Sequence, residues 1–271
     1  MQAAIDFGIT NIDVIYRRAG ELAHLQYPNN GEAVADQLTA VAAALDVPGD
    51  PLVEAAVTGG QYRRLPDQAG GIRLVKIPEV MSIGRGGLHL SGLEEALVVS
   101  AGSGTAMVAA RGKQFAHATG SAVGGGTLQG LGRLLLGTAD ALEIDRLAVQ
   151  GDPNHADLTL VEAVGSGVGK LPLRANAVNF GRLSREAVDL SPEDTAAALV
   201  RMVAQVIAMI AINAVRAEDL SQVVIIGHLV DLPSVRAALD EVFGFYDASY
   251  CVPNQPGIGT AIGELLCLED G

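Results

Sequence analysis

Glycine-rich turns beside short apolar segments recur along the whole chain, and they restrict its fold more than any other feature. Two of these turns, residues 6–11 (DFGITN) and 101–105 (AGSGT), follow hydrophobic strands and combine glycine with hydroxyl side chains. Predicted strands alternate with predicted helices, which indicates an α/β fold. The second strand folds back directly after the first, so the sheet is mixed. We therefore expect two lobes that face each other over a cleft, with a boundary near residue 95.

The periodicity of the apolar residues identifies the elements between the turns. The predicted strands cover residues 3–5, 12–17, 52–58, 72–77, 97–100, 106–110, 223–226 and 250–252. The predicted helices cover residues 31–45, 120–136, 193–216, 233–242 and 257–268. The apolar segment 199–215 is interrupted by Arg201, Gln205 and Asn213, whereas a spanning helix needs about 20 apolar residues. We expect a buried helix between the lobes there.

Charge and composition restrict the partners of the chain. Its 271 residues carry a net charge of −13, which disfavours binding to nucleic acid or to an anionic membrane surface. Hydrophobic residues make up 49% of the chain, enough for a buried core. Cys251 and Cys267 are too few for a disulfide framework or a thiolate metal site. No signal-peptide pattern opens the sequence, so we expect a soluble, cytoplasmic protein with a small-molecule substrate.

The first glycine turn carries groups that suit magnesium and phosphate. Asp6 ends an apolar strand, and Gly8, Thr10 and Asn11 follow it. A carboxylate in this position can hold Mg²⁺ while hydroxyl and amide groups contact phosphate oxygens. An aspartate that caps an ordinary hairpin is the alternative.

The second glycine turn contains Ser103, Gly104 and Thr105. Its small residues expose consecutive N–H groups, which can form a concave anion-binding site. A plain hairpin turn has the same composition and remains an alternative. No lysine follows in the G-K-[ST] pattern, so the chain is not a P-loop nucleoside triphosphatase (NTPase).

A third glycine run, Gly124, Gly125 and Gly126, precedes a predicted helix. Unpaired amides and the helix dipole attract phosphate at such a position, and a flexible loop is the alternative. Gly227, after an apolar strand, and the segment 254–259 are further turns that could face the same nucleotide.

Glu79 follows a proline at the end of a predicted strand. A single carboxylate in a cleft could accept a proton from an attacking hydroxyl, although an exposed glutamate is the plainer interpretation. Arg85, His89 and His117 are candidate substrate contacts. The other histidines lack the spacing of metal ligands.

With these motifs in order, the chain resembles the type II pantothenate kinases of the sugar-kinase/actin/heat-shock ATPase superfamily. The similar stretches are AIDFGITNIDVIY, VVSAGSGTAMV, TGSAVGGGTLQGLGRLLLG, GDPNHADLTLVEAVG, NAVNFGRL, VVIIGHLVDLPSVRAAL and NQPGIGTAIGEL. They span nearly the whole chain in the same order. The resemblance implies a two-lobed actin-like (ribonuclease H-like) fold, with an N-terminal lobe at 1–95 and a C-terminal lobe at 96–271.

The resemblance also implies an activity and its cofactors. ATP and Mg²⁺ would lie between the lobes, and the γ-phosphoryl group would pass to the primary hydroxyl of pantothenate, the first step of coenzyme A synthesis. Coenzyme A or an acyl-CoA is a further possible ligand. The long helix of the C-terminal lobe would pair two copies of the chain into a homodimer.

Site residues follow by position from the same resemblance. Asp6 falls on the metal carboxylate, Glu79 on the catalytic base and His117 on the substrate side, while Arg85 stays a candidate substrate contact from the sequence alone. The nucleotide and phosphate contacts fall on Asp6, Gly8, Thr10, Asn11, Ser103, Gly104, Thr105, Gly124, Gly125, Gly126, Asn179 and Gly227.

The chain departs from the family pattern at several of these places. Ile9 stands where a second glycine is usual, and a β-branched residue resists a positive φ angle. Asp13 lies where a lysine is usual soon after the loop. Met81 and His117 replace an aspartate and an arginine, and neutral histidine is a poorer partner for a carboxylate than arginine.

These departures leave alternatives open. The acceptor could be another small hydroxyl compound, or the chain could be a catalytically inactive relative that binds a nucleotide or acyl-CoA and has a regulatory role. A dehydratase-activating ATPase would need clustered cysteines for an iron–sulfur centre. The short length disfavours a filament-forming actin relative.

Overall fold

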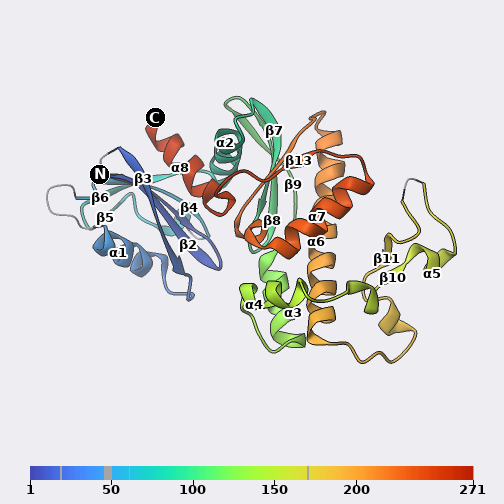
Figure 1. Cartoon of the computed structure of the whole chain (residues 1–271). Helices are drawn as coiled ribbons and strands as arrows, with labels where there is room; N and C mark the ends of the chain where they lie inside the picture. The colour runs from blue at the N-terminus through green and yellow to red at the C-terminus, as the bar shows by residue number, and fades with distance from the viewer. Residues whose placement is uncertain (19, 46–50, 61, 170, 271) are drawn as a thin grey trace.

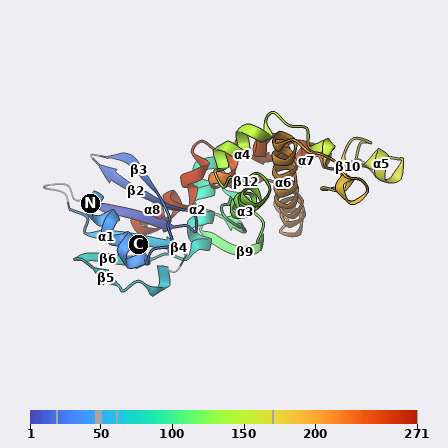
Figure 2. The same cartoon turned by 90° about the horizontal axis from the view of Figure 1, so that it is seen from below.

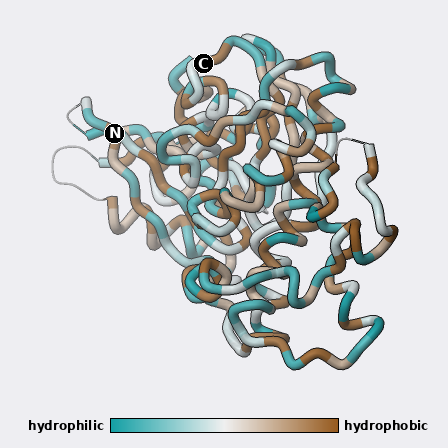
Figure 3. Tube along the Cα trace, turned by 45° about the vertical axis from the view of Figure 1, so that its right-hand side comes forward, coloured by the Kyte–Doolittle hydropathy of each residue, from teal (hydrophilic) through white to brown (hydrophobic). Residues whose placement is uncertain are grey.

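The computed structural model describes residues 1–18, 20–45, 51–60, 62–169 and 171–270. Two β-sheets lie side by side, each with its own helices, and two helices lie between them (Figure 1). Hydrophilic and hydrophobic segments are mixed along the loops at the outer edge of the molecule (Figure 3). The expectation of a two-lobed α/β fold with mixed sheets is confirmed.

The first sheet has the strand order β3-β2-β1-β4-β6-β5. Its strands are β1 (Gln2–Phe7), β2 (Asn11–Arg18), β3 (Glu21–Pro28), β4 (Glu54–Gly59), β5 (Gln68–Ala69) and β6 (Ile72–Lys76). β1 pairs antiparallel with β2 and parallel with β4.

The second sheet has the strand order β13-β12-β7-β8-β9. Its strands are β7 (Glu95–Ala101), β8 (Thr105–Arg111), β9 (Gln114–Ser121), β12 (Val223–Ile226) and β13 (Tyr250–Cys251). β7 pairs antiparallel with β8 and parallel with β12. It thus repeats the place of β1 in the first sheet, which puts the two related turns after β1 and β7 at corresponding positions.

Helices cover both faces of each sheet because side chains alternate along the strands. In β1, Ala3, Ile5 and Phe7 pack toward α1 (Val34–Ala44), whereas Ala4 packs toward α8 (Gly259–Glu269). By the same alternation, Asp6 lies on the α8 side.

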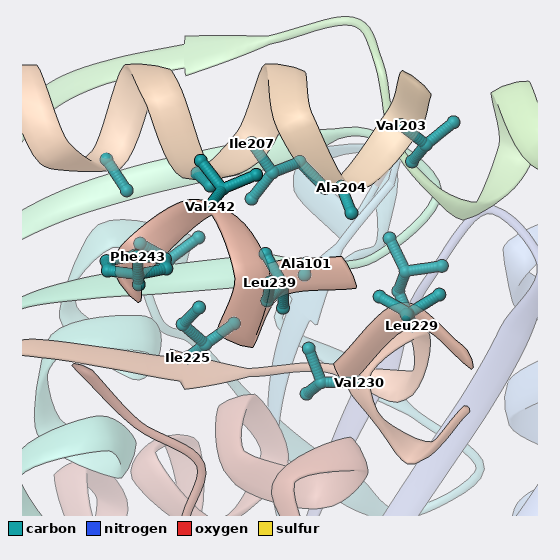
Figure 4. Packing of buried hydrophobic residues seen from close by; sticks show 14 of the residues in the cluster. Ala101, Val203, Ala204, Ile207, Ile225, Leu229, Val230, Leu239, Val242 and Phe243 are labelled. Carbon is teal, nitrogen blue, oxygen red and sulfur yellow. The ribbon is translucent and has the colours of Figure 1, made fainter. Parts of the chain in front are cut away.

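In the second sheet, Ala96 and Val98 of β7 pack in the same cluster as Ile83 of α2 (Glu79–Ser91). The opposite face of β7 packs against α6 (Pro192–Ala217) and α7 (Pro233–Phe245). Figure 4 shows Val203, Ala204 and Ile207 of α6 facing the residues of α7.

The central layer consists of α2 and α8, which cross each other between the sheets. Glycine makes this crossing close: a Cβ atom at Gly263 would lie 1.9 Å from the carbonyl oxygen of Ser82, and one at Gly86 would lie 1.9 Å from that of Gly259. The sequence predicted a helix at 257–268 but none at 79–91. Three glycines within α2 lower its helix propensity, and its burial between the lobes overrides that propensity.

The long helix α6 begins at a capped terminus, where Ser191 Oγ accepts a hydrogen bond from Asp194 N at 3.0 Å. By length and composition alone α6 could cross a membrane, but two thirds of its most apolar window (67%) is buried within the protein. It is a core helix of the second lobe. The expected burial is confirmed, but the expected place between the lobes was wrong, because α2 and α8 form that layer.

Smaller elements complete the second lobe. They are α3 (Gly125–Leu135), α4 (Ala141–Ala148), α5 (Leu160–Val164), β10 (Leu158–Thr159), β11 (Asn176–Val178) and the short 3₁₀ helices η2 (Pro153–His155), η3 (Arg182–Ser184), η4 (His228–Asp231) and η5 (Pro256–Ile258). A further 3₁₀ turn, η1 (Tyr62–Arg64), follows β4. The segment with β10, β11 and α5 projects beyond α6, away from the first sheet (Figure 2). The sequence predicted a helix that begins at residue 120. That boundary was wrong, because Gly120 and Ser121 belong to β9.

The predicted domain boundary falls at the start of β7, and the division at residue 95 stays a prediction. α8 comes last in the chain yet packs on the first sheet. The connecting helix α2 packs on the second sheet.

Candidate active site between the lobes

A cavity of about 480 Å³ lies between the two sheets, and both lobes line it. It brings together ten of the residues that the sequence singled out: Asp6, Gly8, Thr10, Asn11, Glu79, Ser103, Gly104, Thr105, Gly125 and Gly227. They come from the turns after β1 and β7, the first residue of α2, the start of α3 and the end of β12.

The first loop connects β1 to β2 by a close turn. A Cβ atom at Gly8 would lie 2.6 Å from the carbonyl oxygen of Asn11, so only glycine fits there. Ile9 needs no such freedom, because it is not among the described non-glycine residues with positive φ. Its side chain is 75% exposed and borders the cavity. The backbone obstacle expected of Ile9 is therefore absent.

The second loop packs directly on the start of α3. Gly125 N donates to Gly102 O at 2.8 Å, and Gly126 N donates to Ser103 O at 2.9 Å. A Cβ atom at Gly124 would lie 2.7 Å from Ser103 O. The amides expected to receive phosphate are thus already bonded within the protein, and the glycine run serves this close approach. Gly124 and Gly126 lie behind the cavity lining.

The two loops meet across the cavity. Thr10 Oγ1 and Ser103 Oγ lie 2.6 Å apart, within one hydrogen bond, although the residues are in different lobes. Hydroxyl and backbone groups from both loops therefore surround a single small volume, which suits a ligand rich in acceptor oxygens.

Asp6 is the most perturbed carboxylate in the cavity lining. Burial, reinforced by the nearby carboxylates of Asp13 and Glu79, raises its pKa to about 7. Gly59, at φ +84°, lets the carboxylate approach, since a Cβ atom there would lie 2.6 Å from Asp6 Oδ1. A divalent cation would relieve this repulsion between carboxylates.

The donors around Asp6 fit Mg²⁺ better than a metal with many protein ligands. The described residues contain no group of three or more His, Cys, Asp or Glu side chains arranged for a metal ion. Mg²⁺ usually keeps several waters and takes one or two carboxylates together with phosphate oxygens. Asp6 could supply that carboxylate.

A polar cluster that sequence reasoning missed stands beside Asp6. Asp13, the antiparallel strand partner of Asp6, accepts from His228 Nε2 at 2.9 Å and from His24 Nε2 at 3.0 Å. These bonds lower the pKa of the Asp13 carboxyl although its burial opposes them, and the carboxylates raise the pKa of His228 to about 10 against its own burial. A charged residue in the apolar run of β2 was the signal that could have indicated it.

Glu264 of α8 is fully buried, and neither side-chain oxygen has a hydrogen-bond partner among the described groups within bonding geometry. Burial first, and the nearby Asp6 second, raise its pKa well above the usual range. Burial therefore favours the neutral form of the Glu264 carboxyl group. A lone glutamate within the apolar segment 257–268 was its signal in the sequence.

Besides Gly124 and Gly126, three predicted site residues lie outside the cavity lining. Arg85 points to the other side of α2, where its Nη2 atom is 3.0 Å from Asp270 Oδ2. His117 is exposed on β9. Asn179 Oδ1 accepts from Asn176 Nδ2 at 2.6 Å in the projecting segment.

Comparisons with known proteins agree with this arrangement. The model of the Fumble family matches residues 95–249, more than half of the chain. A type II pantothenate kinase of Oceanobacillus iheyensis is 28% identical over 230 residues, which are 82% of this chain and 82% of that protein. A type II pantothenate kinase of Staphylococcus haemolyticus is 33% identical over 136 residues, 50% of this chain and 51% of that protein.

Solved structures show the same fold at low sequence identity. The activator of the 2-hydroxyisocaproyl-CoA dehydratase from Clostridium difficile, with bound ADPNP, superposes with a TM-score of 0.65 at 16% identity, covering 99% of this chain and 94% of that one. A ROK family glucokinase from Streptomyces griseus, in complex with glucose and AMPPNP, gives 0.64 at 13% identity, covering 100% and 99%. The actin-like fold expected from the sequence is thereby confirmed. From the match over residues 95–249 and the agreement in fold, the chain belongs to the Fumble family.

Proposed function

We propose that this protein is an ATP-dependent kinase that phosphorylates the primary hydroxyl of pantothenate. The observation that carries the proposal is the meeting of the two loops over one cavity, with Thr10 and Ser103 2.6 Å apart and with Asp6 and Glu79 in the same lining. The names of the curated relatives support pantothenate as the acceptor, and nucleotide analogues in the similar structures support ATP.

Each lining residue has a role in this reaction. Asp6 would hold Mg²⁺, which neutralises charge on the phosphates when bound. Thr10 and Asn11 from one lobe, and Ser103 to Thr105 from the other, would contact phosphate oxygens. Gly227, at φ +104°, keeps the turn after β12 close to β7, since a Cβ atom there would lie 2.5 Å from Ala101 O.

Glu79 would orient the acceptor hydroxyl and accept its proton. It is exposed, lines the cavity, and is the first residue of α2. Proton acceptance by such a base typically contributes a factor of about 10² to 10⁴ to a rate.

A second candidate acceptor class follows from the placement of Arg85 and His117. Both lie outside the cavity lining, and Arg85 already contacts Asp270. An acceptor without a carboxylate would need neither residue. A kinase for another small hydroxyl compound is therefore the runner-up, and an inactive nucleotide- or acyl-CoA-binding relative comes third because the accommodated Ile9 removes one of its supports.

The test is ATP turnover with pantothenate and with a panel of other hydroxyl compounds. Glu79→Gln should lower kcat with pantothenate by about 10² or more, while the matched change Glu94→Gln, at an exposed position just beyond α2, should leave kcat within about twofold. Turnover only with another acceptor would support the second candidate. Binding of nucleotide or CoA without turnover would support the third, and no binding of either would refute all three.

We further propose a homodimer in the cytoplasm, paired through α6. The exposed side chains of this helix include Asn213 and Arg216. Sedimentation equilibrium of the protein should give twice the chain mass of 27.9 kDa. A value of one chain mass at micromolar concentration would contradict this assignment.

A further inference from the structure

A cluster of polar side chains joins the two lobes at one side of the cavity. Asp13 comes from β2 of the first sheet, and His228 comes from η4 of the second lobe. Asp13 Oδ2 lies 2.9 Å from His228 Nε2, and Asp231 Oδ2 lies 3.2 Å from His228 Nδ1. Each ring nitrogen of His228 thus lies within hydrogen-bond distance of a carboxylate, one in each lobe.

The second-lobe half of this contact is sterically defined. A Cβ atom at Gly257 would lie 2.4 Å from His228 Nδ1 and 2.7 Å from Asp231 Oδ2. The imidazole ring and its aspartate therefore pack directly on the backbone of Gly257. A side chain at residue 257 would therefore displace the ring or its aspartate.

The first-lobe half is fixed as well. Asp13 is only 5% exposed, and His24 and Gln26 of β3 bind its other oxygen at 3.0 Å and 3.3 Å. Gln26 Nε2 also lies 2.9 Å from His228 Nε2. A carboxylate held this firmly is a rigid partner, which lowers the entropy cost of the contact across the lobes.

This contact acts on the same elements that carry the phosphate loops. Asp13 is the strand partner of Asp6. His228 follows β12, whose last residue, Ile226, is in register with Ser100 of β7, directly before the second loop. The Asp13–His228 bond therefore connects the pair β1–β2, which carries Asp6, to the pair β7–β12, which ends at the second loop. A second contact between the lobes is the one between the hydroxyl groups of Thr10 and Ser103.

A direct role of His228 in phosphate binding does not fit this geometry. Its two ring nitrogens lie 2.9 Å and 3.2 Å from the carboxylate oxygens of Asp13 and Asp231. The cluster therefore leaves neither ring nitrogen free for a phosphate oxygen. Its plain consequence is mechanical, because it holds the lobes at one separation.

We propose that Asp13 and His228 are a pair of positioning residues that keep the lobes closed and thereby set the distance between Asp6 and the second phosphate loop. The assignment rests on the proposed function for its catalytic consequence, whereas the closure itself does not depend on it. A close charge pair across an interface commonly contributes a factor of about ten or more to its closure.

The experiment compares Asp13→Asn, His228→Gln and the double variant with His24→Gln. His24 is the matched control because it binds Asp13 at 3.0 Å from within the same lobe. We expect Asp13→Asn and His228→Gln each to speed the release of a fluorescent ATP analogue and to lower kcat by about tenfold, with the KM for the acceptor within about threefold. The double variant should have the same release rate and kcat as either single variant. For His24→Gln, both values should stay within about twofold of the wild type.

Two results would overturn the proposal. One is an effect of His24→Gln as large as that of His228→Gln, since loss of any Asp13 bond would then suffice. The other is additivity of the two single changes, since the residues would then act independently. Thermal unfolding of all four variants separates these outcomes from general destabilisation.

A second measurement keeps closure testable if the wild type shows no kinase activity. Spin labels at Glu21→Cys in β3 and Leu134→Cys in α3, both exposed, report the distance between the lobes after Cys251 and Cys267 are replaced by serine. His228→Gln should broaden and lengthen this distance distribution, whereas His24→Gln should not. An unchanged distribution in His228→Gln refutes the closure, whatever the protein phosphorylates.

Discussion

Replacement of Gly263 by alanine should separate the two helices at the centre of the molecule. The added Cβ atom would lie 1.9 Å from Ser82 O and 2.4 Å from the amide nitrogen of Gly86, and both are backbone atoms of α2. An ordinary contact starts at 3.4 Å, so the helices must move apart by about 1.5 Å at this point. Side-chain rotation cannot relieve a clash with backbone.

The expected cost is the sum of two opposed effects. Overpacking of a close-packed interior costs about 1–3 kcal/mol, and separation of α2 from α8 removes neighbouring contacts as well. Alanine in place of glycine favours the helix by about 1 kcal/mol. We expect a net destabilisation of about 2 kcal/mol, which lowers Tm by about 4–8 °C for a protein of this size.

Gly130→Ala is the matched control. Gly130 lies inside α3, is exposed, and would place a Cβ atom with nothing within 4 Å. The same substitution should there raise stability by about 0.5–1 kcal/mol. Scanning calorimetry of both variants measures the two signs. A Gly263→Ala protein that unfolds at or above the wild-type temperature would show that the helices do not cross by backbone contact.

Three further predictions concern single side chains. Burial raises the pKa of Glu264 in the folded protein, so the stability that the protonated carboxyl contributes is fully present below the unfolded pKa of about 4.5 and is lost as pH rises toward the folded pKa. Glu264→Gln should therefore raise Tm more at pH 8 than at pH 5. An equal shift of Tm at both pH values would contradict the burial of its charge. Mg²⁺ must displace a proton from Asp6, whose pKa is about 7, so calorimetric Mg²⁺ affinity in the presence of ADP should be about tenfold weaker at pH 6 than at pH 8, and Asp6→Asn should remove that dependence. Ile9→Gly should change nucleotide affinity by less than about threefold, because Ile9 is 75% exposed and has no positive φ; a gain of tenfold or more in a fluorescence titration would show that the isoleucine obstructs the phosphates.

The sequence missed β3, β5, β9, β10 and β11 but indicated the other described strands, the two-lobed mixed fold and ten residues of the cavity lining. These features follow from local rules. Apolar residues repeat with a short period along a strand, and glycine is required where backbones approach closely. The turns of Asp6 and Ser103 could be paired in advance because each follows a strand of the same kind. Corresponding strands of two similar sheets then bring them together.

The tertiary structure decided what depends on contacts between distant segments. The helix at 79–91 carries three glycines and has a weak local signal, and it forms because α8, nearly 180 residues later in the chain, packs against it. The bond from Asp13 to His228 joins residues 215 positions apart. Neither local sequence contains a pattern that predicts this contact. Arg85 and His117 lie outside the cavity lining because the direction of a side chain depends on how its helix or strand is turned in the assembled fold. Local periodicity determines the elements, whereas the packing of one lobe against the other determines which of their side chains share a site.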